Sequence, residues 1–487
     1  MLNSPRSMLL NFRKYSTVFL LLIISQSSLS FAQQNAPELG DPYSSVLSLK
    51  NEEIIGISSY QRLQKFNAID NNPLVSSYIN YLGNLLSRNL LDNKRRYNFF
   101  VVNSNQINAF AIPGGFIGLN SGLILLTENE AQLASVIAHE ISHIKLRHTA
   151  EMIASSRKNA IPIWVGIFAG MFSGNPQASI AALQTGFGLS AQQNINLIRS
   201  NEVEADTLGF QILDNANFDA AEMSKLFELM QSAKGDIQKN LAYLSTHPMF
   251  EERISNTENR LKNSKGKLLN STNDYFYIKN LLEVSQIVDI NYAISQLNDK
   301  DDLSKHKLSL LYQKKSDFKK SIDVLGNYQK NINDNIYLAI SYIDGLVGLG
   351  KIEDAISTIN NLINLKPFNK ILPLKLAEIY VDHKKGTSSI IESIKIHDDY
   401  FKLNPNYHRM MSKLYMDTNK KYESTIHLAE YYVLIDNAKL AIDVLENSSK
   451  SSQITSADSE KLKGKKIEIL CKHNRPLEPI FGEKTCN

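Results

Sequence analysis

Apolar residues follow two different periods along the first third of the chain, and each period predicts its own kind of element. After Pro73, the residues Leu74, Tyr78, Leu82 and Leu86 recur every four positions, which predicts a helix with one buried face. Three short apolar runs follow, and a Pro-Gly-Gly turn joins the last two, as is typical of short strands. These runs span residues 99–102, 108–112 and 116–119. We therefore expect a small sheet packed against helices.

A second amphipathic helix is predicted directly after this sheet. Thr127 and Glu130 have the spacing of a capping box, which predicts the start of the helix. Its apolar face is formed by Leu133, Ile137, Ile141 and Ile144. Helical patterns return over 201–213 and 220–231. Residues 161–172 form an apolar run that is too short to cross a bilayer and fits a buried segment or a peripheral membrane contact.

From about residue 305 the chain repeats itself with a period of 34 residues. Two sets of positions show this spacing: Tyr312, Leu346 and Tyr380, and Ser321, Ala355 and Ser389. Helix pairs with this period are the signature of tetratricopeptide repeats. Ala429, Tyr432 and Ala441 fit a further copy out of phase, so we expect an insertion before it. The alternative is a helical bundle without repeats.

Composition and charge narrow the class of protein. The chain has 487 residues, a formal charge of +4 and two cysteines. These values exclude a small disulfide scaffold, an acidic disordered chain and a polytopic membrane protein. The two cysteines, Cys471 and Cys486, lie near the C-terminus, and in an exported protein they are expected to form a disulfide, with two free thiols as the alternative.

The N-terminus has the pattern of a secretory signal. Arg6, Arg13 and Lys14 precede an apolar run at 18–24, and a small-residue cleavage site ends at Ala32. Cleavage there removes three positive charges and no negative ones, which leaves +1 and removes the electrostatic argument for nucleic-acid binding. The alternative is an uncleaved anchor, but the run is shorter than the roughly 20 residues of a spanning helix.

The sharpest chemical signal lies inside the predicted second helix. His139 and His143 are four residues apart, so both imidazoles lie on one helix face and can reach one zinc ion. Glu140 between them can act on a water molecule at the metal. A chance pattern on an amphipathic helix is the alternative.

A catalytic zinc site needs a third protein ligand. The metzincin extension is absent, because Leu146 and Thr149 stand at its glycine and histidine positions. Glu202 and Asp206 lie four residues apart, so Glu202 can bind zinc while Asp206 accepts an imidazole N–H. Glu204 points elsewhere. Without the histidine motif, this pair would equally fit a solvated acidic turn at a helix start.

These motifs together resemble the HtpX-like gluzincin metallopeptidases. The resemblance rests on Asn108-Ala109-Phe110-Ala111, a glycine-containing turn, the segment 138–143, the Glu202–Asp206 segment and Ser245-Thr246-His247-Pro248. It implies one zinc ion held by His139, His143 and Glu202, with Glu140 as general base. It also implies a fourth ligand, His247, which occupies the water position in a resting state. Otherwise His247 is a turn residue before Pro248, and His148 is expected to be structural rather than catalytic.

The strand that contains Asn108, Ala109, Phe110 and Ala111 is a candidate edge strand. Such an edge would hold an extended substrate through backbone hydrogen bonds, which tolerate many side chains. The alternative is an ordinary core strand.

The expected architecture is an α+β zincin-type metallopeptidase domain, mostly helical with a small sheet, followed by an all-α tetratricopeptide-repeat solenoid. The expected boundaries are a signal at 1–32, the peptidase at 33–270, a helical connection at 271–304, repeats at 305–470 and a tail at 471–487. With the signal and repeats attached, the resemblance implies a Gram-negative periplasmic endopeptidase that acts on unfolded proteins in outer-membrane protein assembly and quality control. Its implied partners are β-barrel precursors and the barrel assembly machinery. A repeat-based chaperone with a latent zinc site is the alternative, and a metal-dependent hydrolase of non-peptide substrates is a weaker third.

Overall fold

The computed structural model divides the chain into two units, residues 1–48 and Leu49–Asn487. It describes residues 43–90, 95–155, 191–233, 235, 240–248, 251–261, 269–298, 300–326, 333–383 and 388–473. Of the first unit only 43–48 are described, and they form a turn in which the Leu47 N–H donates to the Tyr43 carbonyl. The expected signal at 1–32, the apolar run at 161–172 and Cys486 lie outside the described residues. No helix within the described ranges has the length and apolar character needed to cross a membrane.

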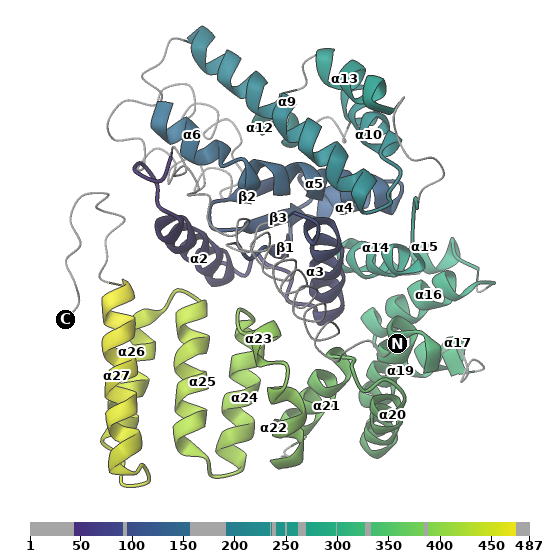
Figure 1. The fold of residues 1–487 in the computed structure, drawn as a ribbon. Helices are drawn as coiled ribbons and strands as arrows, with labels where there is room; N and C mark the ends of the chain where they lie inside the picture. The colour runs from purple at the N-terminus through teal and green to yellow at the C-terminus, as the bar shows by residue number, and fades with distance from the viewer. Residues whose placement is uncertain are drawn as a thin grey trace, which may run out of the picture. The chain divides into compact units, whose positions relative to one another are not determined.

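The first half of the second unit combines helices with one small sheet (Figure 1). Its elements are α2 (Leu49–Lys65), α3 (Pro73–Ser87), β1 (Asn98–Val102), β2 (Ala109–Ile112), β3 (Phe116–Asn120), α4 (Ser121–Leu126), α5 (Glu130–Lys145), α6 (His148–Ser155), α9 (Ala191–Asn215), α10 (Ala221–Gln231), α12 (Tyr243–Thr246) and α13 (Glu251–Leu261). The helices predicted at residues 74–86, 201–213 and 220–231 are confirmed as α3, α9 and α10.

The sheet has the strand order β1-β3-β2, with β1 parallel and β2 antiparallel to β3. Within the described residues β2 therefore lies at an edge. All three predicted strands are confirmed, although Asn108 lies just before β2 rather than inside it. Gly115 joins β2 to β3 with a φ of 88°, and a Cβ there would lie 2.1 Å from the Arg96 carbonyl oxygen, so this turn requires glycine.

Helix α5 is the centre of this half and contacts α3, α9, α10 and β2. The four predicted core positions on it are buried. Several polar residues of the helix are buried as well: Glu130, Gln132, His139, Glu140 and Ser142. The helix is therefore enclosed on all sides, and its polar side chains are held by specific partners. Glu130, for example, accepts hydrogen bonds from the Tyr78 hydroxyl and the Thr272 N–H.

The capping box predicted for α5 is wrong. The N-cap is Asn129, whose side chain accepts from the Gln132 N–H at 2.9 Å. Thr127 instead ends α4, and its hydroxyl donates to the Ile124 carbonyl and contacts the Tyr275 hydroxyl. Sequence spacing alone could not separate two adjacent helix ends that both carry a capping residue.

Replacing Asn129 by alanine should lower the free energy of unfolding by about 1 kcal/mol, because the first turn of α5 loses its side-chain acceptor. Asn129→Ser retains a cap and should lose clearly less. Urea unfolding of the full chain, followed by fluorescence, measures both variants. Equal losses in the two variants would show that the contact of Asn129 with Glu222, rather than the cap, carries the stability.

The second half of this unit consists of helices alone in the described residues. Its elements are α14 (Asn273–Gln286), α15 (Ile290–Ser295), α16 (Asp302–Lys314), α17 (Phe318–Gly326), α19 (Ile336–Gly348), α20 (Ile352–Leu365), α21 (Ile371–Asp382), α22 (Ser388–Lys395), α23 (Asp398–Phe401), α24 (Pro405–Asp417), α25 (Lys421–Leu434), α26 (Ala438–Ser449) and α27 (Ser456–His473).

Apart from the short helix α23, helices α16 to α27 recur in pairs at nearly constant spacing. The first helices of the pairs begin at residues 302, 336, 371, 405 and 438, and the second helices at 318, 352, 388, 421 and 456. Because this spacing continues to the last pair, the insertion expected before Ala441 is not present. One polar contact also recurs between paired helices: the Ser309 and Ser321 hydroxyls lie 2.8 Å apart, and those of Ser412 and Ser424 lie 3.2 Å apart.

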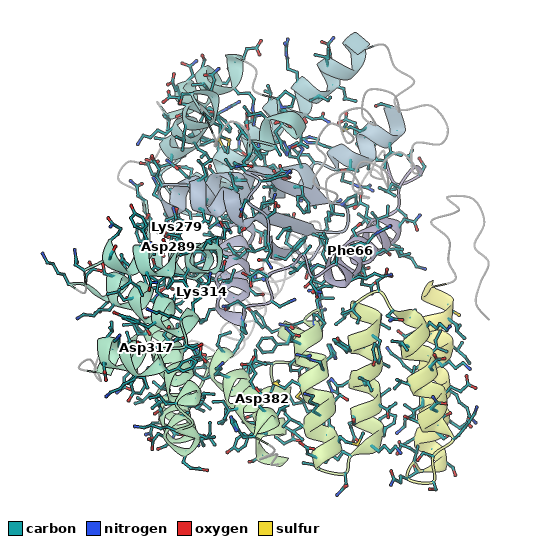
Figure 2. All side chains as sticks on the ribbon, turned by 180° about the vertical axis from the view of Figure 1, so that it is seen from behind. Phe66, Lys279, Asp289, Lys314, Asp317 and Asp382 are labelled. Atoms are coloured by element: carbon teal, nitrogen blue, oxygen red, sulfur yellow. The ribbon has the colours of Figure 1, made fainter. Side chains whose placement is uncertain are left out.

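Helix α14 connects the two halves, since it contacts α3 and α4 on one side and α16 on the other. Two lysines labelled in Figure 2 satisfy helix ends around it. Lys314 donates to the carbonyls of Val284, Ser285 and Ile287 at the end of α14, and Lys279 donates to those of Leu125 and Thr127 at the end of α4. A cation is favourable at a helix C-terminus, so these contacts stabilise the connection.

Candidate metal centre

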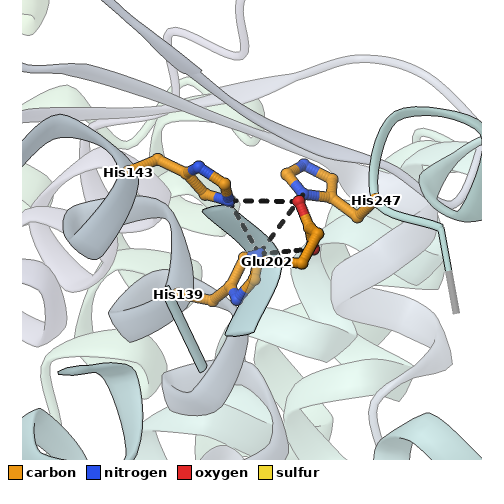
Figure 3. A group of neighbouring side chains, drawn as sticks. All are labelled: His139, His143, Glu202 and His247. Atoms are coloured by element: carbon orange, nitrogen blue, oxygen red, sulfur yellow. Dashed lines mark hydrogen bonds and ion pairs between the residues drawn. The ribbon is translucent and has the colours of Figure 1, made fainter. Parts of the chain in front are cut away.

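Three elements bring the predicted ligands together. His139 and His143 lie one turn apart on α5, Glu202 lies on α9, and His247 directly follows α12. Gly209 allows the close approach of α9 to α5, because a Cβ at this position would lie only 3.3 Å from the His139 backbone nitrogen. The fold thus brings the four predicted residues, which come from three separate segments of the chain, to one point, as Figure 3 shows.

These four side chains form what we call the ligand cluster: His139, His143, Glu202 and His247. One ligand atom from each lies within 4.8 Å of the others. His139 Nε2 is 2.9 Å from His143 Nε2, 3.2 Å from His247 Nδ1 and 3.4 Å from Glu202 Oε2. Glu202 Oε1 is 3.5 Å from His143 Nε2 and 3.0 Å from His247 Nδ1.

The ligand cluster fits a zinc ion. Tetrahedral bonds of about 2.0–2.1 Å place neighbouring ligand atoms about 3.3 Å apart, which lies within the range of the distances found here. Three imidazoles and one carboxylate are also the donor types that zinc prefers. A metal ion is the simplest reason for several imidazole nitrogens to face one another inside a protein.

Burial and neighbouring charges set the protonation of the cluster. Burial lowers the pKa of His143 to about 3, so this imidazole is neutral. Burial would also lower the pKa of His139, but the Glu202 and Asp206 carboxylates outweigh it and raise that pKa to about 9. Burial opposes the charge of Glu202 too, yet His247 and Arg253 hold its pKa well below the ordinary value.

Asp206 takes the place predicted for it. Its Oδ1 lies 2.9 Å from His139 Nδ1, so the carboxylate can accept the N–H of the ring and aim Nε2 at the cluster. Burial raises the pKa of this carboxyl, but Arg253 and His139 outweigh burial and lower it, so Asp206 is charged.

Arg253 on α13 is a functional residue that sequence reasoning missed. Its guanidinium donates to both oxygens of Asp206, at 2.7 and 2.8 Å, and lies 2.8 Å from Glu202 Oε2. The side chain has no solvent exposure. Arg253 therefore holds a predicted ligand and its neighbour in one fixed arrangement, and its positive charge offsets the two buried carboxylates.

Glu140 lies beside the cluster in a completely buried position. Neither carboxylate oxygen has a hydrogen-bond partner within the described residues, and His247 Nε2 lies 3.4 Å from Oε1. Burial raises the pKa of Glu140 above its ordinary value. A carboxylate that lacks partners in the interior is suited to accept a proton.

His247 is held by its own short loop. The Tyr243 ring stacks on the His247 ring with centroids 4.6 Å apart, and the His247 N–H donates to the Tyr243 carbonyl. Ile107 ties this loop to the sheet, because its N–H donates to the Asn240 carbonyl and its carbonyl accepts from the Tyr243 N–H. The loop thus begins beside the predicted substrate strand.

His148 and Glu204, for which no ligand role was expected, do not belong to the ligand cluster. His148 Nδ1 lies 2.8 Å from His143 Nδ1, on the side of that ring away from the cluster. Glu204 is exposed and lies 3.7 Å from His148 Nε2. Of the predicted edge residues, Ala109, Phe110 and Ala111 lie in β2.

Comparison with known proteins identifies the class to which this arrangement belongs. The family described as Peptidase family M48 matches residues 77–261, which contain the whole ligand cluster. The chain belongs to this family and is a zinc metalloprotease.

The chain is also similar to individual proteins of known name. The Beta-barrel assembly-enhancing protease of Yersinia pestis is 30% identical over 370 residues, which cover 74% of this chain and 76% of that protein. The protein of the same name from Escherichia coli O157:H7 is 33% identical over 268 residues, or 54% and 55% of the two chains. The Mitochondrial metalloendopeptidase OMA1 of Schizosaccharomyces pombe is 34% identical over 172 residues, or 35% and 49%.

Proposed function

We propose that this protein is an exported zinc endopeptidase of the periplasm that acts in outer-membrane protein assembly and quality control. In this role it degrades misassembled β-barrel proteins and promotes the assembly of others. The observation that carries the proposal is the ligand cluster with the buried carboxylate of Glu140 beside it. The names of the relatives from Yersinia and Escherichia support the substrate class.

The residues of the chain have separate roles in peptide hydrolysis. His139, His143 and Glu202 would hold the zinc ion, which supplies Lewis acidity that polarises a peptide carbonyl and lowers the pKa of water. Glu140 would take a proton from the attacking water and pass it to the leaving amine. Asp206 and Arg253 would keep the ligands oriented. Edge strand β2 would align the substrate through its backbone.

His247 would keep such a protease inactive until the loop that carries it moves. Its Nδ1 faces the other ligand atoms while its Nε2 faces Glu140 at 3.4 Å. One ring would therefore occupy the fourth ligand position and would also block the general base from water. Movement of the loop that carries His247 would open both at once.

Replacing His247 by alanine should raise casein hydrolysis by the zinc-loaded protein several-fold, because the blocking ring is removed while three ligands remain. The matched control is His383→Ala, an exposed histidine at the end of α21 that should leave the rate unchanged. Initial rates with a fluorescent casein measure all three proteins. A lower rate in His247→Ala than in the wild type would contradict the resting-state role.

The helix pairs from α16 to α27 would form the docking part of the protein. We assign residues 33–270 to the peptidase domain and 305–470 to tetratricopeptide repeats, since the 34-residue spacing of the helix starts is typical of such repeats. Repeats of this kind present extended surfaces for protein partners, and the partners proposed are β-barrel precursors and their assembly machinery.

The substrate class is tested directly with an unfolded outer-membrane β-barrel protein. The zinc-loaded protein should cleave it in the unfolded state and leave it intact after it has folded into lipid vesicles, because only the unfolded chain offers an extended backbone. Cleavage of both states at one rate would overturn the quality-control role.

The blocking position of His247 also favours the second candidate, a chaperone or adaptor whose zinc site stays latent. A Glu140→Gln strain separates the two. If assembly of outer-membrane proteins is fully retained while hydrolysis is lost, the repeats rather than the peptidase carry the essential activity.

A further inference from the structure

The two α5 histidines of the ligand cluster differ in what binds their second ring nitrogen. His139 Nδ1 contacts the Asp206 carboxylate at 2.9 Å. His143 Nδ1 contacts another imidazole, that of His148, at 2.8 Å. In zinc sites, the second nitrogen of a ligand histidine usually donates to a carboxylate, a carbonyl or water. His148 therefore stands where an acceptor is needed, and this requires a particular tautomer of its ring.

The orientation of His143 determines that tautomer. Its Nε2 faces the ligand cluster, 2.9 Å from His139 Nε2, so this nitrogen must present its lone pair to a metal ion. The ring proton then lies on Nδ1, and its partner is His148 Nδ1. Since His148 accepts at Nδ1, the proton of its own neutral ring lies on Nε2. The two ring planes are turned by 78° relative to each other, with the centroids 4.9 Å apart, and the Nδ1 edges face each other at 2.8 Å.

The outer nitrogen of His148 points at a carboxylate. Nε2 lies 3.7 Å from Glu204 Oε2 and has no hydrogen-bond partner within the described residues. An N–H at this position faces a negative charge, which favours the tautomer required by His143. Glu204 lies on α9, two residues after Glu202, so the helix that supplies a ligand also supplies this charge.

The place of His148 is fixed by the turn between α5 and α6. Arg147 makes this turn with a positive φ of 59°, and His148 follows as the first residue of α6, where it is 3% exposed. The Arg147 guanidinium binds the buried carboxylate of Glu52 on α2 at 2.8 and 2.9 Å. A buried ion pair thus anchors the turn, and the His148 ring has little freedom to move away from His143.

We propose that His148 is a positioning residue of the zinc site, which fixes the tautomer and ring orientation of His143 through the hydrogen bond between their Nδ1 atoms. The Glu204 carboxylate, 3.7 Å from His148 Nε2, lies on the outer side of this pair of rings. The inference rests on the proposed zinc ligands, and it adds a residue that binds neither metal nor substrate.

Zinc affinity of the full chain, measured by competition with a chromophoric chelator, tests the proposal. His148→Phe fills the space of the ring without an acceptor and should weaken zinc binding by about 10- to 100-fold. His148→Asn places an amide oxygen near the position of Nδ1 and should restore most of the affinity. The control is His306→Phe, a fully buried histidine of α16 outside the ligand cluster, which should bind zinc as the wild type does.

An NMR spectrum of the wild-type protein tests the same contact without any substitution. In the zinc-loaded, ¹⁵N-histidine-labelled protein, His143 should carry its proton on Nδ1 and His148 on Nε2. The opposite tautomer of His148, or equal zinc affinity in wild type and His148→Phe, would overturn this inference alone. An absence of zinc binding by the wild type would overturn the proposed function as well.

Discussion

Replacing Glu140 by glutamine should lower the rate of casein hydrolysis by about a thousandfold, the contribution expected of a general base. Glutamine has nearly the same shape but cannot accept the proton of the attacking water. The carboxylate it replaces is buried and is not one of the four residues of the ligand cluster. Zinc content should therefore stay at one ion per chain, measured by mass spectrometry on the same samples as the rates.

Two comparisons make the Glu140 experiment specific. Glu151→Gln on α6 changes a carboxylate outside the ligand cluster and should leave the rate within twofold of the wild type. Glu202→Gln, in contrast, should lose zinc together with activity, because it removes a ligand oxygen. If Glu140→Gln kept more than a tenth of the wild-type rate, another group would have to act as the base.

Replacing Arg253 by methionine should lower the free energy of unfolding of the zinc-free protein by about 3–5 kcal/mol, the range for removing one partner of a buried ion pair. Methionine occupies similar volume but leaves the Asp206 and Glu202 carboxylates without the guanidinium that binds both. Urea unfolding followed by circular dichroism measures the loss. Zinc affinity should fall in the same variant, since both carboxylates lose their orientation.

Arg199→Met is the matched control for Arg253. Arg199 lies on α9 with about half of its side chain exposed, and such surface changes usually alter stability by less than about 0.5 kcal/mol. Arg253→Lys retains the charge without the paired donors and should fall between the wild type and Arg253→Met. Equal stability of wild type and Arg253→Met would show that the buried carboxylates need no guanidinium.

Most of the ligand cluster was predictable because its residues occur in short motifs with a characteristic spacing. His139 and His143 share a helix face through their four-residue spacing, and Glu202 and Asp206 have the same spacing on another helix. Sequence could not show that α5 and α9 meet, but a motif with two histidines needs a third ligand, which limits the choices. His247 was harder, and only the resemblance to a family singled it out.

Apart from Asp206, the partners of these ligands were not predictable, because they depend on packing between helices that are distant in sequence. In the sequence Arg253 is one of several charged residues in a polar helix. Nothing in the sequence shows that its guanidinium is buried against Asp206. His148 was expected to be structural, and its contact with His143 depends on the backbone turn at Arg147. The helix end at Asn129 was missed for a local reason, since two capping residues lie close together.

The repeat period was visible in sequence because each helix pair has nearly the same length. The phase of the last pairs was misjudged, since Ala429 lies in the second helix of one pair and Ala441 in the first helix of the next. The helix starts at 405, 421, 438 and 456 show a regular array in which α23 fits between α22 and α24 without a shift of the period.

The central claim is that one zinc ion lies between His139, His143 and Glu202, and anomalous diffraction at the zinc absorption edge tests it most directly. Crystals of the wild-type protein should give one strong anomalous peak per chain, about 2.0–2.2 Å from the Nε2 atoms of both histidines and from a carboxylate oxygen of Glu202. No peak in zinc-loaded crystals, or a peak bound by other residues, would contradict the account.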